Sequence, residues 1–161
     1  MKSAYLPWLA LSATVLALDQ TSKAVASALI PLGGHVEVFG FFSWVLLHNT
    51  GAAFSIGGQW GPVASWLFAL VAVGFSIFLV VEIRRVATSE PSLALGFSLI
   101  LGGALGNLSD RVMHGHVVDF VLVHYRDWYF PAFNVADSAI TTGAALWIFL
   151  AIVSMRKSGA S

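Results

Sequence analysis

Long apolar runs divide the chain into four segments of membrane-spanning length. They cover roughly residues 4–30, 61–83, 91–108 and 138–155, and about 20 mainly apolar residues suffice for a helix to cross the hydrocarbon of a bilayer. Pro91 suits the first turn of a helix, and pairs of basic residues close the second and fourth runs. The pattern predicts a mainly α, integral membrane fold with four transmembrane helices.

Two segments between these runs are more polar. Residues 31–60 contain glycine pairs, a short alternation at Val36 and Val38, and a second strand-like stretch at 41–47, which are features of short strands joined by turns. Residues 109–136 form the other segment. We expect a small extramembrane β element within 31–60 and a loop over 109–136, in a single membrane domain that covers residues 1–161.

The composition is that of an integral membrane protein. Hydrophobic residues make up 58% of the 161 positions and charged residues only 10%, whereas a soluble domain carries about 25% charged residues. The formal net charge is zero and the basic residues are dispersed, so nothing indicates a nucleic-acid partner. Because the chain has no cysteine, disulfides, thiolate metal sites and cysteine nucleophiles are excluded.

The distribution of basic residues predicts an orientation. One side of the four runs carries Lys2, Arg84, Arg85, Arg156 and Lys157, and the other carries only Arg111 and Arg126. Cytoplasmic loops hold the excess of Lys and Arg, so both termini are expected in the cytoplasm. The segments 31–60 and 109–136 then share the outer face.

Polar residues interrupt the first run. Its opening resembles a secretory signal with small residues at 26–28, but Asp19, Gln20 and Lys23 lie where a signal peptide would be apolar. Asp19 and Lys23 are four apart, so on a helix they share a face and can neutralise each other. A retained helix with a buried polar face is therefore favoured, although such charges also occur in small transporters and channels.

Two further carboxylates flank an aromatic segment. Asp119 lies in the apolar, strand-like run Val117–Val121, and Asp137 lies where the fourth helix should begin. Asp137 alone would be explained as a helix N-cap, but Asp119 has no comparable structural explanation. Two carboxylates brought close together share one proton, and the helix N-terminus favours the ionised form of Asp137. An aspartic protease needs this pairing to activate water and polarise a carbonyl.

Two polar motifs accompany the acids. Asn107, Asp110 and Arg111 are three and four apart and would face one way at a helix end, either to hold substrate or simply as a terminus capped by an Asp–Arg pair. The stretch 49–54 is small and polar, and either allows close backbone approach or forms a plain turn.

A zinc site is the alternative chemistry. His114, His116, Asp119 and His124 have a spacing that would allow them to bind zinc and activate water. Histidines near a membrane interface are also common without any metal.

With these residues assembled, the chain resembles the lipoprotein signal peptidases, also called signal peptidase II, of the bacterial inner membrane. The similarity rests on five motifs in order, 19–23 (DQTSK), 49–55 (NTGAAFS), 106–111 (GNLSDR), 117–120 (VVDF) and 133–137 (FNVAD). No motif position departs from the family pattern.

The resemblance implies an aspartic endopeptidase with Asp119 and Asp137 as its catalytic pair and no metal or other cofactor. Its substrates would be diacylglyceryl-modified prolipoproteins, cut just before the lipidated cysteine, at a site near the periplasmic surface. Supporting or substrate-binding roles are implied for Asp19, Lys23, Asn49, Gly51, Asn107, Asp110, Arg111, Asn134 and Ala136. The resemblance also implies contact with membrane lipid and inhibition by the cyclic peptide globomycin, and we expect a monomer.

Overall fold

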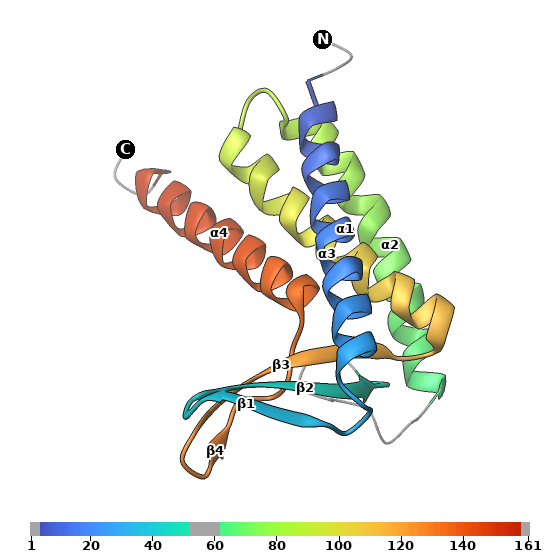
Figure 1. The fold of residues 1–161 in the computed structure, drawn as a ribbon. Helices are drawn as coiled ribbons and strands as arrows, with labels where there is room; N and C mark the ends of the chain where they lie inside the picture. Colours follow the sequence, from blue (N-terminus) through green and yellow to red (C-terminus); the bar gives the residue numbers. More distant parts are fainter. Residues whose placement is uncertain (1–3, 52–61, 159–161) are drawn as a thin grey trace.

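Four helices stand on a small antiparallel sheet in the computed structural model of the chain, which describes residues 4–51 and 62–158 (Figure 1). The helices are α1 (Leu6–Leu29), α2 (Pro62–Val86), α3 (Pro91–His114) and α4 (Val135–Ser158). The strands are β1 (His35–Phe39), β2 (Phe42–Asn49), β3 (Val117–Tyr125) and β4 (Trp128–Tyr129). The rest of the predicted β segment, at 52–60, and the predicted start of the second helix at 61 lie outside the described residues.

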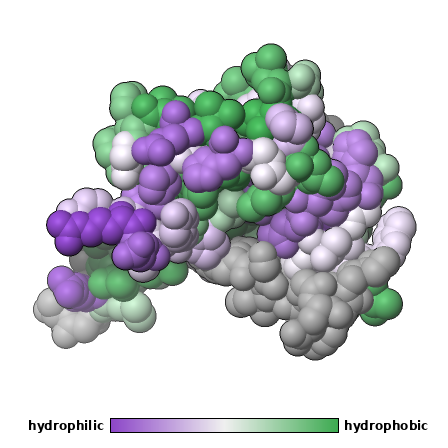
Figure 2. Space-filling view, turned by 60° about the horizontal axis from the view of Figure 1, so that its bottom comes forward, coloured by the Kyte–Doolittle hydropathy of each residue, from purple (hydrophilic) through white to green (hydrophobic). Residues whose placement is uncertain are grey.

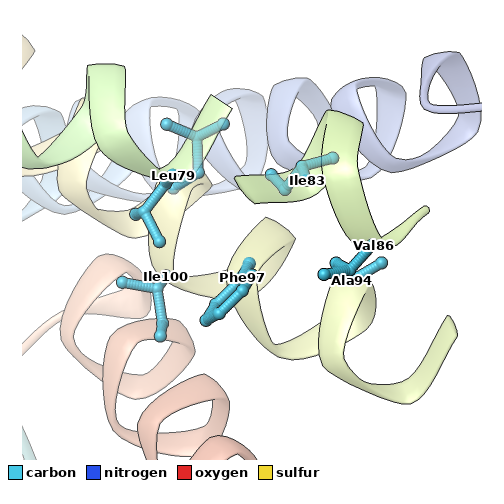
Figure 3. Close-up of a cluster of buried hydrophobic side chains, with 7 residues drawn as sticks. Leu79, Ile83, Val86, Ala94, Phe97 and Ile100 are labelled. Carbon is cyan, nitrogen blue, oxygen red and sulfur yellow. The ribbon is translucent and has the colours of Figure 1, made fainter. Parts of the chain in front are cut away.

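Helix α3 occupies the centre of the helical layer and packs against α1, α2 and α4. Leu79, Ile83 and Val86 of α2 point toward Phe97 and Ile100 of α3 in the apolar core between them (Figure 3). On the opposite side, α4 packs along α3, with Gly143 against Gly96 and the rings of Phe97 and Trp147 5.5 Å apart, and it leans away from α2 (Figure 1). Helix α3 therefore lies between α2 and α4.

Glycine permits the close contact between α3 and α4. A Cβ atom at Gly103 would collide with the carbonyl oxygen of Ala136 and with Ile140, and one at Gly143 would lie 2.5 Å from the carbonyl oxygen of Gly96. Side chains at these positions would push the two helices apart. The glycines therefore fix the first turns of α4 against α3.

Within the described residues, α2, α3 and α4 are long and apolar enough to cross a membrane. Helix α1 has 24 residues, enough length to span, but Asp19 and Lys23 lower its mean hydropathy. Both side chains are buried, Asp19 completely and Lys23 to 3% exposure. Leu18 and Leu29 are among its exposed residues instead. The span formed by α1 therefore stays a prediction.

The four strands form one sheet in the order β1-β2-β3-β4, beyond one end of the helices (Figure 1). Strand β2 pairs with β3 so that Asn49 lies opposite Val117 and Leu47 opposite Asp119. The sheet end of the molecule mixes hydrophilic with hydrophobic residues (Figure 2). The prediction of a loop over 109–136 is thus wrong in part, because nine of those residues form β3. Its apolar residues are stabilised by pairing with the distant strand β2.

Two helix boundaries also differ from the predicted ones. Helix α3 continues past residue 108 to His114 and ends at Gly115, which has a left-handed φ of 78°. Helix α4 begins at Val135 rather than 138. Polar residues in these stretches indicated helix ends, but Asp110 and Arg111 are buried and Asp137 is half-buried, and protein partners replace water around them.

Candidate active site

Asp119 lies on β3 and is almost completely buried, with 3% of its surface exposed. Its two carboxylate oxygens accept hydrogen bonds from different elements. The side-chain amide of Asn49, at the end of β2, donates to Oδ2 at 3.0 Å, and that of Asn134 donates to Oδ1 at 2.8 Å. The pairing of β2 with β3 brings Asn49 within reach, although the two residues lie 70 positions apart in the chain.

Asp137 lies in the first turn of α4 as part of a capping box. The side-chain oxygen of Asn134 accepts the backbone N–H of Asp137 at 2.9 Å, and the Asp137 carboxylate accepts the backbone N–H of Asn134 at 3.3 Å. Such reciprocal bonds satisfy backbone N–H groups that a helix start leaves unpaired. Asn134 is therefore the N-cap, and the interpretation of Asp137 as the cap is wrong. Its other oxygen accepts a bond of 2.8 Å from Asn107.

Asn134 connects the two acids. It is fully buried, and its side chain bonds Asp119 through the amide nitrogen and the Asp137 backbone through the oxygen. Burial, and after it the neighbouring charge of Asp137, raise the pKa of the Asp119 carboxyl to about 7, against the lowering effect of Asn49, Asn134 and Lys23. At neutral pH one of the two acids thus holds a proton readily, which is the electrostatic pattern of a carboxylate pair.

A second polar cluster lies behind the acids, between α1 and α3. Lys23 forms ion pairs of 2.8 Å with both Asp19 and Asp110, and donates to Asn107 at 3.0 Å. The predicted Asp19–Lys23 pair is therefore present. Gly106 has no side chain there, and a Cβ atom would lie 2.5 Å from Asp19.

This cluster also bonds the backbone next to each of the two acids. Asp19 accepts the N–H of Ala136, next to Asp137, at 2.8 Å. Asp110 accepts the N–H of Val118, next to Asp119, at 3.0 Å. The buried charges thus anchor the two segments that carry the acids to the same pair of helices.

Asn107 and Asp110 share the ammonium group of Lys23, whereas Arg111 has other partners. Arg111 donates to the backbone oxygens of Gly51 at 2.8 Å and of Asn107 at 3.2 Å, and Gly51 in turn donates to the side chain of Asn49 at 2.9 Å. The alternative of a helix terminus capped by Asp110 and Arg111 is wrong, because α3 continues and the two side chains contact different partners. Arg111 instead fixes the turn that follows Asn49.

A cavity of about 560 Å³ opens between α2, α3 and α4 beside the acids. Its polar end is formed by Asn49, Asn107, Arg111 and Asp137. The remaining wall is largely apolar and includes Phe68, Val71, Phe75, Ile100, Ala104 and Ile140. Asp137 borders the cavity directly, and Asn49 connects Asp119 to its wall.

The histidines of the alternative zinc site do not converge: the ring centroids of His114 and His116 lie 5.8 Å apart, but His124 has other partners. His124 hydrogen-bonds the hydroxyl of Ser43 at 2.9 Å, whereas His116 stacks on His48 with ring centroids 3.7 Å apart. Burial, followed by the nearby His48 and His114, lowers the pKa of His116. Among residues 4–51 and 62–158, no group of three or more potential ligands is positioned to hold a metal ion.

The sequence contained partners that motif spacing did not identify. Gln20 donates to Asp110 at 2.9 Å and to Asp19 at 3.2 Å, so it belongs to the buried cluster. Its position next to Asp19 in an otherwise apolar helix could have indicated that Gln20 is a buried partner of the acid. The guanidinium carbon of Arg111 lies 5.7 Å from the ring centroid of Phe68. Nothing in the sequence distinguishes Phe68 from the other aromatic residues of the apolar runs.

Comparison with known proteins connects this geometry to a family. The profile of the family Signal peptidase (SPase) II matches residues 11–153. The chain belongs to the signal peptidase II family. The resemblance drawn from the five motifs is thereby confirmed. Members of this family are proteases that process lipoproteins, so the chain is a bacterial inner-membrane protease rather than a transporter.

Similar proteins cover almost the whole chain. The lipoprotein signal peptidase of Pseudomonas paraeruginosa is 50% identical over 156 residues, which are 96% of this chain and 92% of the relative. That of Pseudomonas aeruginosa is 49% identical over the same shares. A solved bacterial membrane enzyme, determined by the in meso method at 2.3 Å resolution, is 30% identical with a TM-score of 0.79, covering 92% of this chain and 88% of the other. The signal peptidase II fold therefore extends over this chain.

Proposed function

We propose that this signal peptidase II is an aspartic endopeptidase that removes the signal peptide from diacylglyceryl-modified prolipoproteins, cutting before the lipidated cysteine. The observation that carries this proposal is the bridging of Asp119 and Asp137 by Asn134 beside a largely apolar cavity. The cavity's apolar wall suits a signal peptide and acyl chains, and its polar end suits the peptide bond. Globomycin is proposed to occupy the same site.

In the proposed mechanism, Asp137 is the ionised base and Asp119 the protonated acid. The helix N-terminus stabilises the charge of Asp137, and burial keeps the proton on Asp119 near neutral pH. Asp137 takes a proton from water as the water oxygen attacks the scissile carbonyl carbon, while Asp119 donates its proton to the carbonyl oxygen. Collapse of the tetrahedral intermediate returns a proton to the leaving amine and breaks the C–N bond.

The remaining polar residues would keep this arrangement fixed. Asn49, Asn107 and Asn134 orient the carboxylates, and Arg111 holds Gly51 beside them. Asp19, Lys23, Asp110 and the Ala136 N–H are proposed to support the site from behind. Because every one of these residues comes from one chain, we propose that the monomer is the active unit.

We propose that all four helices span the inner membrane with both termini in the cytoplasm and the acids near the periplasmic surface. Basic residues Arg84 and Arg156 lie toward the ends of α2 and α4 remote from the sheet, in agreement with the bias of Lys and Arg toward the cytoplasm. The charged residues of α1, Asp19 and Lys23, are buried toward α3 rather than exposed to lipid. Substrate would then reach the cavity sideways through the bilayer.

The test of this function compares one precursor with and without its diacylglyceryl group. Purified enzyme in liposomes is expected to cleave the lipidated form at least about 100-fold faster, because the lipid fixes the depth of the scissile bond and removes orientational freedom. Mass spectrometry of the products should place the cut immediately before the modified cysteine. Equal rates for the two forms, or no cleavage of either, would contradict the proposal.

The pH dependence follows from Asp119. The rate of cleavage is expected to fall as the pH rises through about 7, because the acid then loses the proton that polarises the carbonyl. The raised pKa also implies that the folded state binds this proton more tightly than the unfolded chain does. Stability contributed by the protonated carboxyl is therefore present in full below pH about 4 and is lost as the pH rises through about 7.

Initial rates and thermal midpoints measured in parallel from pH 5 to 9 would check both effects. The matched control is Asp119→Asn, whose side chain cannot titrate and whose thermal midpoint should lose this component of the pH dependence. A wild-type rate that keeps rising from pH 7 to 9 would refute the assignment of Asp119 as the acid.

A further inference from the structure

The first two turns of α4 present hydroxyl groups to the cavity. Ser138, Thr141 and Thr142 line it together with Asp137, and all three are exposed. Their spacing of three and four residues places them on neighbouring positions of one helical face. A row of polar side chains thus extends from Asp137, the proposed base, along a helix whose middle part is apolar on its exposed side.

The hydroxyls of Thr141 and Thr142 are unused. Ser138 donates to the carbonyl oxygen of Asn134 at 3.0 Å, but neither threonine makes a side-chain hydrogen bond with any residue that the structure describes. Thr14, in contrast, bonds the carbonyl oxygen of Ala10 in its own helix at 2.9 Å. The two threonines therefore keep both donor and acceptor capacity toward the cavity.

In the middle of α4, from Gly143 to Val153, the exposed residues are apolar, and among the side chains that the structure describes, exposed polar residues return only at Ser154 and Arg156. Ile148, Phe149 and Ile152 are all more than two-fifths exposed, as expected for a surface in contact with hydrocarbon. Polar side chains within a membrane segment are costly unless they meet polar partners. Ser154, near the far end of α4, bonds the carbonyl oxygen of Ala151 in its own helix, whereas Thr141 and Thr142 line the cavity next to Asp137. Their position indicates a polar ligand there.

The distances fit an extended peptide. Thr141 and Thr142 follow Asp137 by four and five residues, which is about 6 to 7.5 Å along a helix axis, or about two residues of extended chain. In the proposed orientation, α4 runs from the acids into the bilayer, and so does the substrate on the amino side of its scissile bond. An extended segment there would leave backbone N–H and C=O groups without water.

We propose that Thr141 and Thr142 form a backbone-binding subsite for the two to three substrate residues that precede the scissile bond. The proposal rests on the proposed function. A hydroxyl pairs with a peptide N–H or C=O of any sequence, so this subsite holds the unwound backbone without selecting side chains.

The first test replaces each threonine by valine, which keeps the shape of the side chain and removes the hydroxyl. Thr141→Val and Thr142→Val are each expected to raise KM for the lipidated precursor about three- to tenfold, with kcat within about twofold, because one ground-state hydrogen bond is lost. Thr→Ser at the same positions should restore KM. Thr14→Val, on α1, is the matched control and should leave KM unchanged.

The second test alters the substrate. Precursors in which one peptide N–H, two or three residues before the scissile bond, is replaced by an ester oxygen should bind wild type several-fold more weakly. The same replacement should cost the double valine variant little, since the partner hydroxyls are already gone.

The outcomes separate the subsite from the enzyme's function. If wild type and the Thr14→Val control cleave normally and both valine variants keep the wild-type KM, the subsite is overturned while the protease stands. The subsite is also overturned if the ester replacement weakens precursor binding by the same factor in wild type and in the double valine variant. If wild type fails to cleave the lipidated precursor, the proposed function fails, and the subsite with it.

Discussion

Replacement of either proposed catalytic aspartate by asparagine is expected to reduce cleavage of the lipidated precursor by at least about 10³-fold. In the proposed mechanism, Asp137→Asn removes the base that takes a proton from water, and Asp119→Asn removes the acid that polarises the carbonyl. Asparagine preserves the shape of each side chain, so both variants should insert and fold. The measurement is the single-turnover rate in liposomes, with the thermal unfolding midpoint recorded on the same samples.

A matched control is available at Asp127, an exposed residue in the turn between β3 and β4. Asp127→Asn makes the same chemical change outside the cavity and should keep the wild-type rate. Cleavage at the wild-type rate by purified Asp119→Asn or Asp137→Asn would refute the carboxylate pair. Loss of the rate together with a large fall in the midpoint of both variants would assign these aspartates to folding instead.

Replacement of Asp19 by alanine is expected to lower the free energy of unfolding by about 3 to 5 kcal/mol. The change removes one of the two carboxylates that pair with Lys23 and leaves the N–H of Ala136 without its acceptor. The Lys23 ammonium and the Ala136 N–H are both buried, so water cannot replace the lost carboxylate as their partner. We expect turnover per folded molecule to change far less, because Asp19 contacts the backbone beside Asp137, the proposed base, rather than the reacting atoms.

The surface pair of Glu82 and Arg85 provides the comparison for this prediction. Their charged atoms are 3.7 Å apart, and the Arg85 side chain is 78% exposed, so Glu82→Ala should change stability very little. Denaturant titration in detergent, combined with active-site titration, would separate stability from turnover. An Asp19→Ala protein of wild-type stability with selectively lost catalysis would show that Asp19 acts in the reaction.

The sequence alone predicted the features that depend on local composition. Apolar runs of sufficient length identified the helices, since the hydrocarbon thickness sets how many residues a span needs. The four-residue spacing of Asp19 and Lys23 predicted their ion pair, because helix geometry brings such positions together. The carboxylate of Asp119 indicated the candidate site, because burying a lone charge among apolar residues is energetically unfavourable and needs a functional reason.

Only the tertiary structure decided how these pieces meet. The pairing of β2 with β3 brings Asn49 to Asp119, and the capping role of Asn134 connects Asp119 with Asp137. The spacing of these residues along the chain predicts neither contact, because packing across the whole chain sets the strand register and the helix positions. Buried partners also explain why α3 and α4 continue through polar residues that resemble helix ends in the sequence. The chain specified which charged groups would be buried, and the fold determined which of them would share a hydrogen-bond partner.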